Sequence, residues 1–588
     1  MREQKTIKQI LEEKQKDREH TSLYDTEAVK EINKEFEKWR NALSLGREKS
    51  GDSWHKTPHT VLGSEIRRDL LYTPANVTNL DYKKEIGFSG EKPYTRGIHA
   101  DMYRGREFTI RQLCGFGGPE NTNERIKFLL KQGATGVSIV FDLPTIQEYD
   151  SDDPMAMEQV GMGGVAIDSV EDMERLFKDV PIDKISVSLV SHYPTNTAIL
   201  FSMYLVMAER RGISWDMLNG SVQNDFVMEE VVRGAPEFIP PDDCFRIQCD
   251  NIEFIRENVP RFNCVTLNGY NLREAGTSGI TETSVAMANA IEILKEMSRR
   301  GHDADTVAGR LAFFWDISND FFEEIARLRG ARRLWYKIMK YGFNAKSDRA
   351  MWMRCHAQTS GICLSRYEPM NNIVRAAYHA LAAVFGGVQS LHVNSYDEAY
   401  SVPTEVASMV SLRTQQIIQE ETATTIVVDP LGGSFYVESL TDEIEKMILD
   451  EINEIEELGG IVKAVERGWL HKKIAEYARH ENEMIEREEI RMVGHNYAKA
   501  VNMEIPEIDV FSYPKDVAEK QQKKLKILRQ QRDNKQVEAY LQKLQEACRL
   551  GENIMPYCLE ATRVNATEGE MAKVFKKAFG LWKPPAYW

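Results

Sequence analysis

Short apolar runs alternate with helix-like stretches between residues 108 and 393, and this alternation constrains the fold more than any other feature. Eight runs of apolar or β-branched residues occur, at Phe108–Cys114, Val137–Phe141, Ile185–Leu189, Ser221–Gln223, Cys264–Leu267, Arg310–Phe314, Met353–His356 and Ser390–Val393. Helical patterning lies between them, for example at Thr122–Gln132, Val170–Phe177, Thr197–Arg211, Thr283–Arg300, Asn319–Tyr341 and Asn371–Phe385. Strands that alternate with helices form parallel sheets. The sequence therefore predicts an α/β fold, and the count of eight favours a (β/α)8 TIM barrel over a doubly wound open sheet.

The segments that flank this region have a different pattern. Residues 1–48 place apolar side chains at helical spacing, among them Val29, Ile32, Phe36 and Trp39, and residues 49–84 are rich in turn formers. Beyond residue 425 the chain reads as mostly helical, with residues 516–550 as one charged helix. We predict an N-terminal arm and linker (1–84), a barrel domain (85–425) and a helical C-terminal region (426–588).

Polar residues follow the predicted strands, as at Asp142, His192, Asn224, Asn268 and Asn394. Active sites of such barrels lie at the carboxyl ends of the strands. The alternative explanation is that these residues are ordinary polar turn residues where strands end in solvent. The recurrence of amides and hydroxyls fits side chains that line a cavity better.

The bulk composition excludes several classes of protein. A net charge of −15 disfavours nucleic-acid binding, which needs a basic surface. No stretch is apolar over the ~18 residues that a bilayer span requires, and the N-terminus does not resemble a signal peptide. The eight cysteines form no CxxC pair, so we expect reduced thiols, a cytoplasmic location and no metal site in this chain.

Four arginines crowd the segment 95–117, namely Arg96, Arg104, Arg106 and Arg111. A barrel strand tolerates so many guanidinium groups only when anions pair with them. The phosphates of a nucleotide-like ligand could be these anions. The alternative is that the arginines form salt bridges with acidic helices of the same chain.

Ten motifs then follow one another in a characteristic order. They are TRGIHADMYRGREFTIRQLCGFG (95–117), FDLPT with YDSDDP (141–154), GVAIDS (164–169), SVSL (186–189), QNDF (223–226), NGY with EAG (268–276), RLAFFW (310–315), HAQTSG (356–361), QSLHVNSYDEA (389–399) and DPLGGS (429–434). Over residues 85–500 the sequence thereby resembles the methylmalonyl-CoA mutase family, and in particular large subunits of the isobutyryl- and 2-hydroxyisobutyryl-CoA mutase type.

The resemblance implies a barrel that threads the pantetheine of coenzyme A along its axis, with the acyl group beneath adenosylcobalamin. The reaction would be a radical rearrangement of an acyl-CoA carbon skeleton. By their motifs, the residues expected at coenzyme A are Met102, Arg106, Thr109, Arg111, Ser138, Ser186, Ser188 and Arg310. Gln223 is expected at the acyl group, and those expected at adenosylcobalamin are His356, Gln358, Gln389, Asn394 and Glu398.

Three positions depart from the family pattern. Leu113 stands where methylmalonyl enzymes have a substrate-contacting Tyr, and it leaves more room for a branched acyl chain. Val140 stands where the hydroxyacyl enzymes have Asp, which argues against a hydroxyl-bearing substrate. Asn271 replaces the His that bonds the thioester carbonyl, and an amide donates a hydrogen bond but is no general acid.

Arg233 matches the family Arg that binds the free carboxylate of methylmalonyl-CoA, which suggests a carboxylate-bearing acyl group. The alternative is that Arg233 pairs with Glu229 or Glu230 in its own segment.

Family members that hold B12 in one chain carry a DxHxxG motif whose His binds cobalt. None of the twelve His residues here has Asp two positions before it. The resemblance therefore implies a separate cobalamin-binding small subunit, in a heterotetramer of two large and two small subunits, with the arm (1–48) and the C-terminal tail as candidate contacts. The alternative function is a non-catalytic acyl-CoA sensor on the same fold.

Overall fold

The computed structural model describes residues 5–16, 23–50, 66, 68–233, 237–501 and 507–585. Side chains are not described at 15, 16, 43–50, 229, 230 and 233, so the side chain of Arg233 lies outside the described set, as do residues 51–65 and 67 of the predicted linker.

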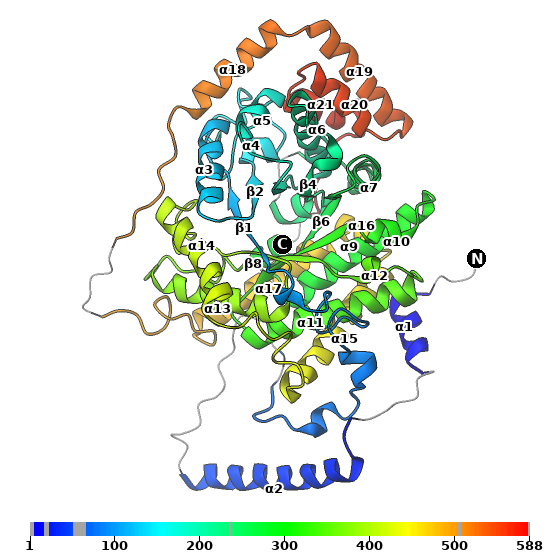
Figure 1. Cartoon of the computed structure of the whole chain (residues 1–588), viewed down its shortest axis with the longest axis vertical. Coiled ribbons are helices and arrows are strands. Elements are labelled where there is room, and N and C mark those ends of the chain that lie inside the picture. Colours follow the sequence, from blue (N-terminus) through cyan, green and yellow to red (C-terminus); the bar gives the residue numbers. More distant parts are fainter. Residues whose placement is uncertain are drawn as a thin grey trace.

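A parallel barrel forms the centre of the molecule (Figure 1). Its strands are β1 (Thr109–Cys114), β2 (Gly136–Val140), β3 (Ser186–Val190), β4 (Asn219–Val222), β5 (Phe262–Asn263), β6 (Val265–Asn268), β7 (Leu311–Ile317), β8 (Cys355–Thr359) and β9 (Ser390–His392). They hydrogen-bond in the order β5-β4-β3-β2-β1-β9-β8-β7-β6, and every ladder is parallel.

The two ends of this sheet are halves of one strand. Only Cys264 separates β5 from β6, and the Thr266 N–H donates to the Gln223 carbonyl at 2.9 Å across the seam. The predicted α/β barrel is thus confirmed. The fifth predicted strand, Cys264–Leu267, corresponds to β6, which pairs with β7, whereas β5 lies before the predicted start and pairs with β4.

Helices follow the strands and cover the barrel. The long ones are α3 (Pro119–Lys131), α6 (Pro194–Arg210), α7 (Pro241–Asn258), α9 (Gly279–Arg299), α11 (Phe321–Lys337), α13 (Asn371–Gly386) and α14 (Glu405–Glu420), with the shorter α5 (Val170–Leu176). Helix α6 is buried from Pro194 to Ala208, because α20 (Met555–Arg563) covers the side that faces away from the barrel. A helix that is apolar all round needs such a double cover.

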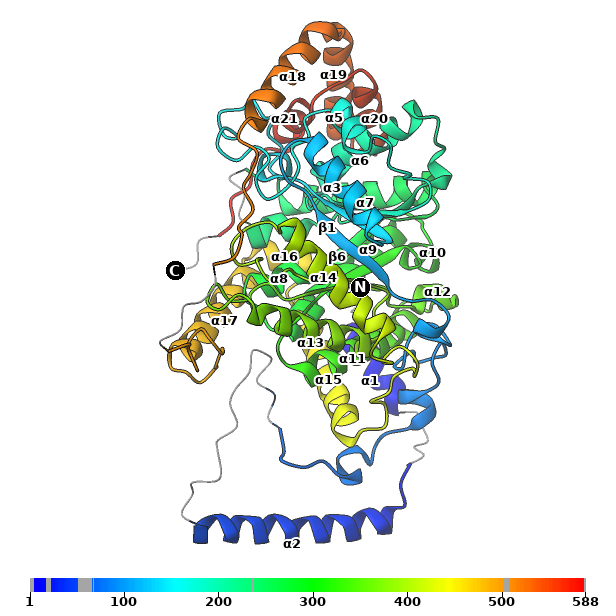
Figure 2. The ribbon, with the colours of Figure 1, turned by 60° about the vertical axis from the view of Figure 1, so that its left-hand side comes forward.

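The N-terminal arm consists of two helices with different surroundings. Helix α1 (Ile7–Lys16) packs on the body, burying Ile7 and Leu11, and the Ile7 N–H donates to Glu456 at 2.9 Å. Helix α2 (Thr26–Ser50) lies as a separate rod at one end of the molecule (Figures 1 and 2), where Trp39 is 42% exposed. No helix in the described part of the chain is long and apolar enough to cross a bilayer.

The C-terminal region is helical. It comprises α15 (Phe435–Glu457), α16 (Ile461–Glu466), α17 (Trp469–Glu486), α18 (Val517–Gln531), α19 (Asn534–Leu550), α20 and α21 (Glu568–Phe579). The single helix predicted over 516–550 is wrong, because Asp533 accepts hydrogen bonds from the Lys535 and Gln536 N–H groups and so begins a second helix.

Buried arginines on α11 attach the C-terminal region to the barrel. Arg329 pairs with Asp429 and Glu438, and Arg333 pairs with Asp442 at 2.6 Å. Asp429, from the DPLGGS motif, also pairs with Arg96 at 3.1 Å. For Arg96 the salt-bridge interpretation is therefore correct, and this part of the motif has a structural role.

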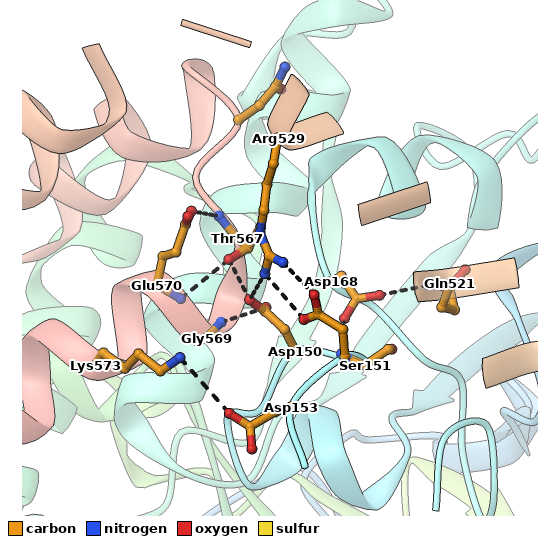
Figure 3. A network of polar contacts seen from close by, with 12 residues as sticks. Asp150, Ser151, Asp153, Asp168, Gln521, Arg529, Thr567, Gly569, Glu570 and Lys573 are labelled. Carbon is orange, nitrogen blue, oxygen red and sulfur yellow. Dashed lines mark hydrogen bonds and ion pairs between the residues drawn. The ribbon is translucent and has the colours of Figure 1, made fainter. Parts of the chain in front are cut away.

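A second polar network fastens α18 and α21 to the loop after β2 (Figure 3). The buried Asp150 accepts hydrogen bonds from Arg529 at 2.8 Å, the Thr567 hydroxyl at 2.7 Å and the Gly569 N–H at 2.8 Å. Gln521 donates to Asp168 at 3.0 Å in the same loop. This loop carries the YDSDDP motif, so the C-terminal helices hold in place a segment at the carboxyl face of the barrel.

Replacing Arg529 with methionine should lower the melting temperature, because Asp150 would stay buried without its cation. Leaving a buried group unsatisfied costs about 1–3 kcal/mol. The control is Lys573→Met, since Lys573 is 71% exposed, lies 3.9 Å from Asp153 and should contribute little. Equal melting temperatures for the two variants would show that the network does not hold the helices.

Candidate functional site

An axial cavity of about 440 Å³ runs through the barrel. Alternate residues of β1 face it, namely Thr109, Arg111 and Leu113, while Ile110, Gln112 and Cys114 do not line it. Serines from the next three strands form much of the remaining wall: Ser138, Ser186, Ser188 and Ser221. Barrels of this fold are usually filled by layers of Val, Ile and Leu. Small polar side chains here leave room for an elongated ligand.

Arg111 lies inside this cavity without a carboxylate. Its guanidinium donates to the Ser186 hydroxyl, and its Nε has no partner among the described residues. Burial lowers the pKa of Arg111 to about 10. A desolvated cation held only by a hydroxyl is costly, so the site suits a ligand that presents an anion or a carbonyl oxygen.

Guanidinium groups also gather where the strands begin. Arg106, Arg349 and Arg354 line the cavity at this amino end. Arg354 donates to the carbonyls of Gly309 (2.6 Å) and Leu311 (2.9 Å), and burial together with Arg349 and Arg310 lowers its pKa to about 10. The mouth is thus strongly cationic although the chain is acidic overall.

The predicted coenzyme A residues mostly converge on this cavity. Met102, Arg106, Thr109, Arg111, Ser138, Ser186 and Ser188 line it, whereas Arg310 lies beside it and acts electrostatically on Arg354. Arg349 and Arg354 were not predicted; their place just before β8 is the only signal for them in the sequence.

A hydrogen-bonded group occupies the carboxyl ends of β8 and β9. The Gln358 amide donates to the Tyr270 hydroxyl and to Asn394 Oδ1, both at 2.8 Å. The Tyr270 ring stacks on Phe314 at 5.0 Å, and Phe314 lies 4.9 Å from the His356 ring. Burial holds the pKa of His356 well below its usual range, so this imidazole is neutral. Tyr270 was not predicted, although it lies in the NGY motif.

Two buried polar atoms near the centre of the barrel lack partners among the described residues. They are Gln223 Oε1 and Thr266 Oγ1, and both side chains line the axial cavity. Gln358 Oε1 is likewise buried and unpaired within the described structure. Such atoms indicate places where a bound molecule would complete the hydrogen bonding.

Three further predicted residues are placed as follows. The Gln389 side chain accepts from the Cys355 N–H and donates to the Gly387 carbonyl, both at 2.9 Å, so it braces the backbone beside the cavity. Asn271 lies on the short helix α8 (Tyr270–Glu274) and is not among the residues that line the axial cavity. Arg233 ends the helical segment Met228–Arg233, and its side chain is not described.

A second cavity of about 430 Å³ lies over the carboxyl end of β1. Leu113 lines both cavities, whereas Val140 and Glu398 line only the second. Burial and the neighbouring Glu274 and Asp397 raise the pKa of Glu398 to about 8. The protonated carboxyl of Glu398 is therefore available as a hydrogen-bond donor at neutral pH.

Comparison with known proteins agrees with this geometry. The methylmalonyl-CoA mutase family profile matches residues 61–581. The chain belongs to the methylmalonyl-CoA mutase family. It is 40% identical over 526 residues to the 2-hydroxyisobutanoyl-CoA mutase large subunit of Aquincola tertiaricarbonis, covering 89% of this chain and 92% of that protein.

Methylmalonyl-CoA mutases are related at a similar level. The enzyme of Cereibacter sphaeroides is 38% identical over 555 residues, covering 93% of this chain and 76% of the relative. The human mitochondrial enzyme is 39% identical over 531 residues, covering 89% and 69%. Membership of this family makes the chain an isomerase of the acyl-CoA mutase class.

The stability contributed by Glu398 should depend on pH. Its folded-state pKa of about 8 exceeds the ordinary value of 4.5, so its contribution is complete below pH 4.5 and is lost as pH rises through 8. The melting temperature of the wild type should therefore fall relative to that of Glu398→Gln between about pH 5 and pH 9. A constant difference between the two proteins across this range would contradict the assignment.

Proposed function

We propose that this chain is the catalytic large subunit of an adenosylcobalamin-dependent mutase that rearranges the carbon skeleton of a branched or carboxylate-bearing acyl-CoA. The observation that carries the proposal is the axial cavity of a chain of this family: its serine walls, and an Arg111 that has no carboxylate partner among the described residues, suit a slender, polar ligand.

Each part of the cavity has a role in this proposal. Arg106, Arg349 and Arg354 bind the phosphates of coenzyme A at the amino end, where a cluster of guanidiniums attracts anions. Arg111 and the serines bind the pantetheine arm and the thioester. Gln223 and Thr266 then lie deeper along the axis, beside the acyl group.

The carboxyl end of the barrel fits a large polar cofactor. Gln358 presents an unpaired amide oxygen, and its mutual bonds with Tyr270 and Asn394 hold all three side chains in place. With His356, Gln389 and Glu398 they would hold adenosylcobalamin, which supplies the radical when bound. The chain's own contribution is to orient the acyl group and to exclude water with the aromatic wall of Tyr270 and Phe314.

We further propose that a separate small subunit provides the cobalt ligand. The relative of which this chain covers 92% is itself named a large subunit, and no His here follows Asp by two residues. The exposed apolar stripe of α2, with Ile32 and Trp39, is a candidate contact in a heterotetramer of two large and two small subunits. All eight cysteines are buried and form no disulfide in the described structure, which fits a cytoplasmic location.

Three positions bear on the acyl group. Leu113 offers no phenol and widens the cavity, and Val140 cannot bond a substrate hydroxyl. Arg233 is proposed to bind a substrate carboxylate. Asn271 favours the second candidate function, a non-catalytic acyl-CoA sensor, because no imidazole is available there for the thioester.

The purified chain should isomerise an acyl-CoA when mixed with a small subunit of the family and adenosylcobalamin. Mass spectrometry would screen isobutyryl, pivalyl, 3-hydroxybutyryl, methylmalonyl and alkylsuccinyl esters for isomers. Turnover of any ester supports the mutase. Binding of esters without turnover, with a small subunit shown to assemble, would favour the sensor.

Arg111→Met should weaken acyl-CoA binding about tenfold or more, because a charge-assisted hydrogen bond contributes about 1.5–3 kcal/mol. Arg104→Met is the matched control, since Arg104 belongs to the same segment but is exposed and does not line the cavity. Isothermal titration calorimetry of both variants measures the effect, and equal affinities would place the ligand elsewhere.

A further inference from the structure

The second cavity extends from Leu113, beside the proposed position of the acyl group, to a buried cation. Leu113, which lines both cavities, and Val140 lie at one end of it. Arg125 of α3 lies in its wall and is only 7% exposed. The cavity therefore connects the carboxyl end of the barrel with a guanidinium outside the β1 strand.

Arg125 has only neutral partners. Its Nη1 donates to the Pro403 carbonyl at 3.1 Å and to the Ser408 hydroxyl at 3.2 Å, and its guanidinium stacks 5.0 Å from the centre of the Phe116 ring. Within the described chain no carboxylate lies within ion-pair distance of it. Asp397 and Glu405 act on it only from farther away, and burial lowers the pKa of Arg125.

The contrast with other buried arginines shows what Arg125 lacks. Arg329 and Arg333 are paired with carboxylates, and Arg332 uses three nitrogens to bond the backbone carbonyls of Tyr94, Thr95 and Gly386. Arg125 engages only Nη1 among the described residues, so the hydrogens on its Nε and Nη2 remain available to a ligand in the cavity that it lines. Ser401 Oγ, in the same wall, is also buried and unpaired within the described part.

We infer that this cavity is an acyl subsite in which Arg125 binds a carboxylate at the end of the substrate's acyl chain. The inference rests on the proposed function and deepens it by naming the substrate class: an acyl-CoA with a second, distal carboxylate. Leu113, which lines both cavities, stands at the boundary between them.

The lining matches a short alkyl chain with one anionic head. Leu129, Val140 and Val402 provide apolar surface, and Arg125 with the free hydroxyl of Ser401 provides the polar end. Glu398, which also lines this cavity, has a pKa raised to about 8, so its carboxyl is mostly protonated at neutral pH. A carboxylate accepts two parallel hydrogen bonds from one guanidinium, whereas the amino-end mouth offers three guanidiniums to phosphates. Leu113 and Arg125 thus select acyl groups with a distal carboxylate at a site separate from Arg233.

The test measures binding to the large subunit alone by calorimetry, with glutaryl-CoA and pentanoyl-CoA as matched probes that differ in the distal carboxylate. The wild type should bind glutaryl-CoA about tenfold more tightly. Arg125→Gln should abolish this preference, and Arg125→Lys should retain part of it. Because no turnover is required, failure of the mutase assay and failure of this subsite remain distinguishable.

Two matched controls separate the charge from its surroundings. Ser408→Ala removes a structural partner of Arg125 but not the cation, so it should keep the preference. Arg104→Gln removes an exposed guanidinium that lines neither cavity, so it should also keep it. Absence of a preference in the wild type, its survival in Arg125→Gln, or its loss in Arg104→Gln would overturn the inference.

Should Arg125→Gln fail to fold, Val402→Trp provides an independent variant, because Val402 lines the second cavity but not the axial one. It fills part of the second cavity and leaves the guanidinium of Arg125 in place, so it should weaken glutaryl-CoA at least tenfold while acetyl-CoA, which does not enter the second cavity, binds as before. Equal affinities of the wild type and Val402→Trp for glutaryl-CoA would contradict the subsite.

Discussion

Closure of the parallel sheet around an uncompensated cation is the constraint on which the site depends. In a closed barrel each strand directs alternate side chains inward. That alternation brings Arg111 into a space walled by serines, where no carboxylate neutralises it. The fold therefore carries an energetic cost that a bound polar ligand would offset, and the unpaired oxygens of Gln223 and Thr266 add to it.

Contacts outside the barrel compensate for this polar interior. The barrel gives up part of the apolar packing that normally fills it, and two ionic networks outside it provide stabilising contacts instead. Arginines of α11 fasten α15 and the DPLGGS turn to one side, and Arg529 with Thr567 fastens α18 and α21 to the loop after β2. These networks also position segments that flank the two cavities, which links the C-terminal helices to the geometry of the site.

Much of this arrangement could be predicted from the sequence, because strand and helix periodicities differ and the family motifs are ordered along the chain. The short strand β5 could not, since the polar Asn263 separates Phe262 from the apolar run that begins at Cys264. The start of a second helix at Asp533 could not be predicted either, because the helical pattern of residues 516–550 continues across it. Arg349, Arg354 and Arg125 are spread over the sequence and converge only through the fold. Whether Asn271 and Gln389 touch ligand depends on side-chain direction, which no motif specifies.

The central claim is that the ligand lies along the barrel axis, and filling that axis tests it most directly. Ser188 faces the cavity, so Ser188→Leu should occupy the space with an apolar side chain; Ser298→Leu makes the same change on the exposed surface of α9. Calorimetry with an acyl-CoA, together with the melting temperature, distinguishes the outcomes. The account predicts that Ser188→Leu keeps its folded stability but loses binding at least tenfold, while Ser298→Leu binds as the wild type does. Unchanged binding in a folded Ser188→Leu protein would contradict it.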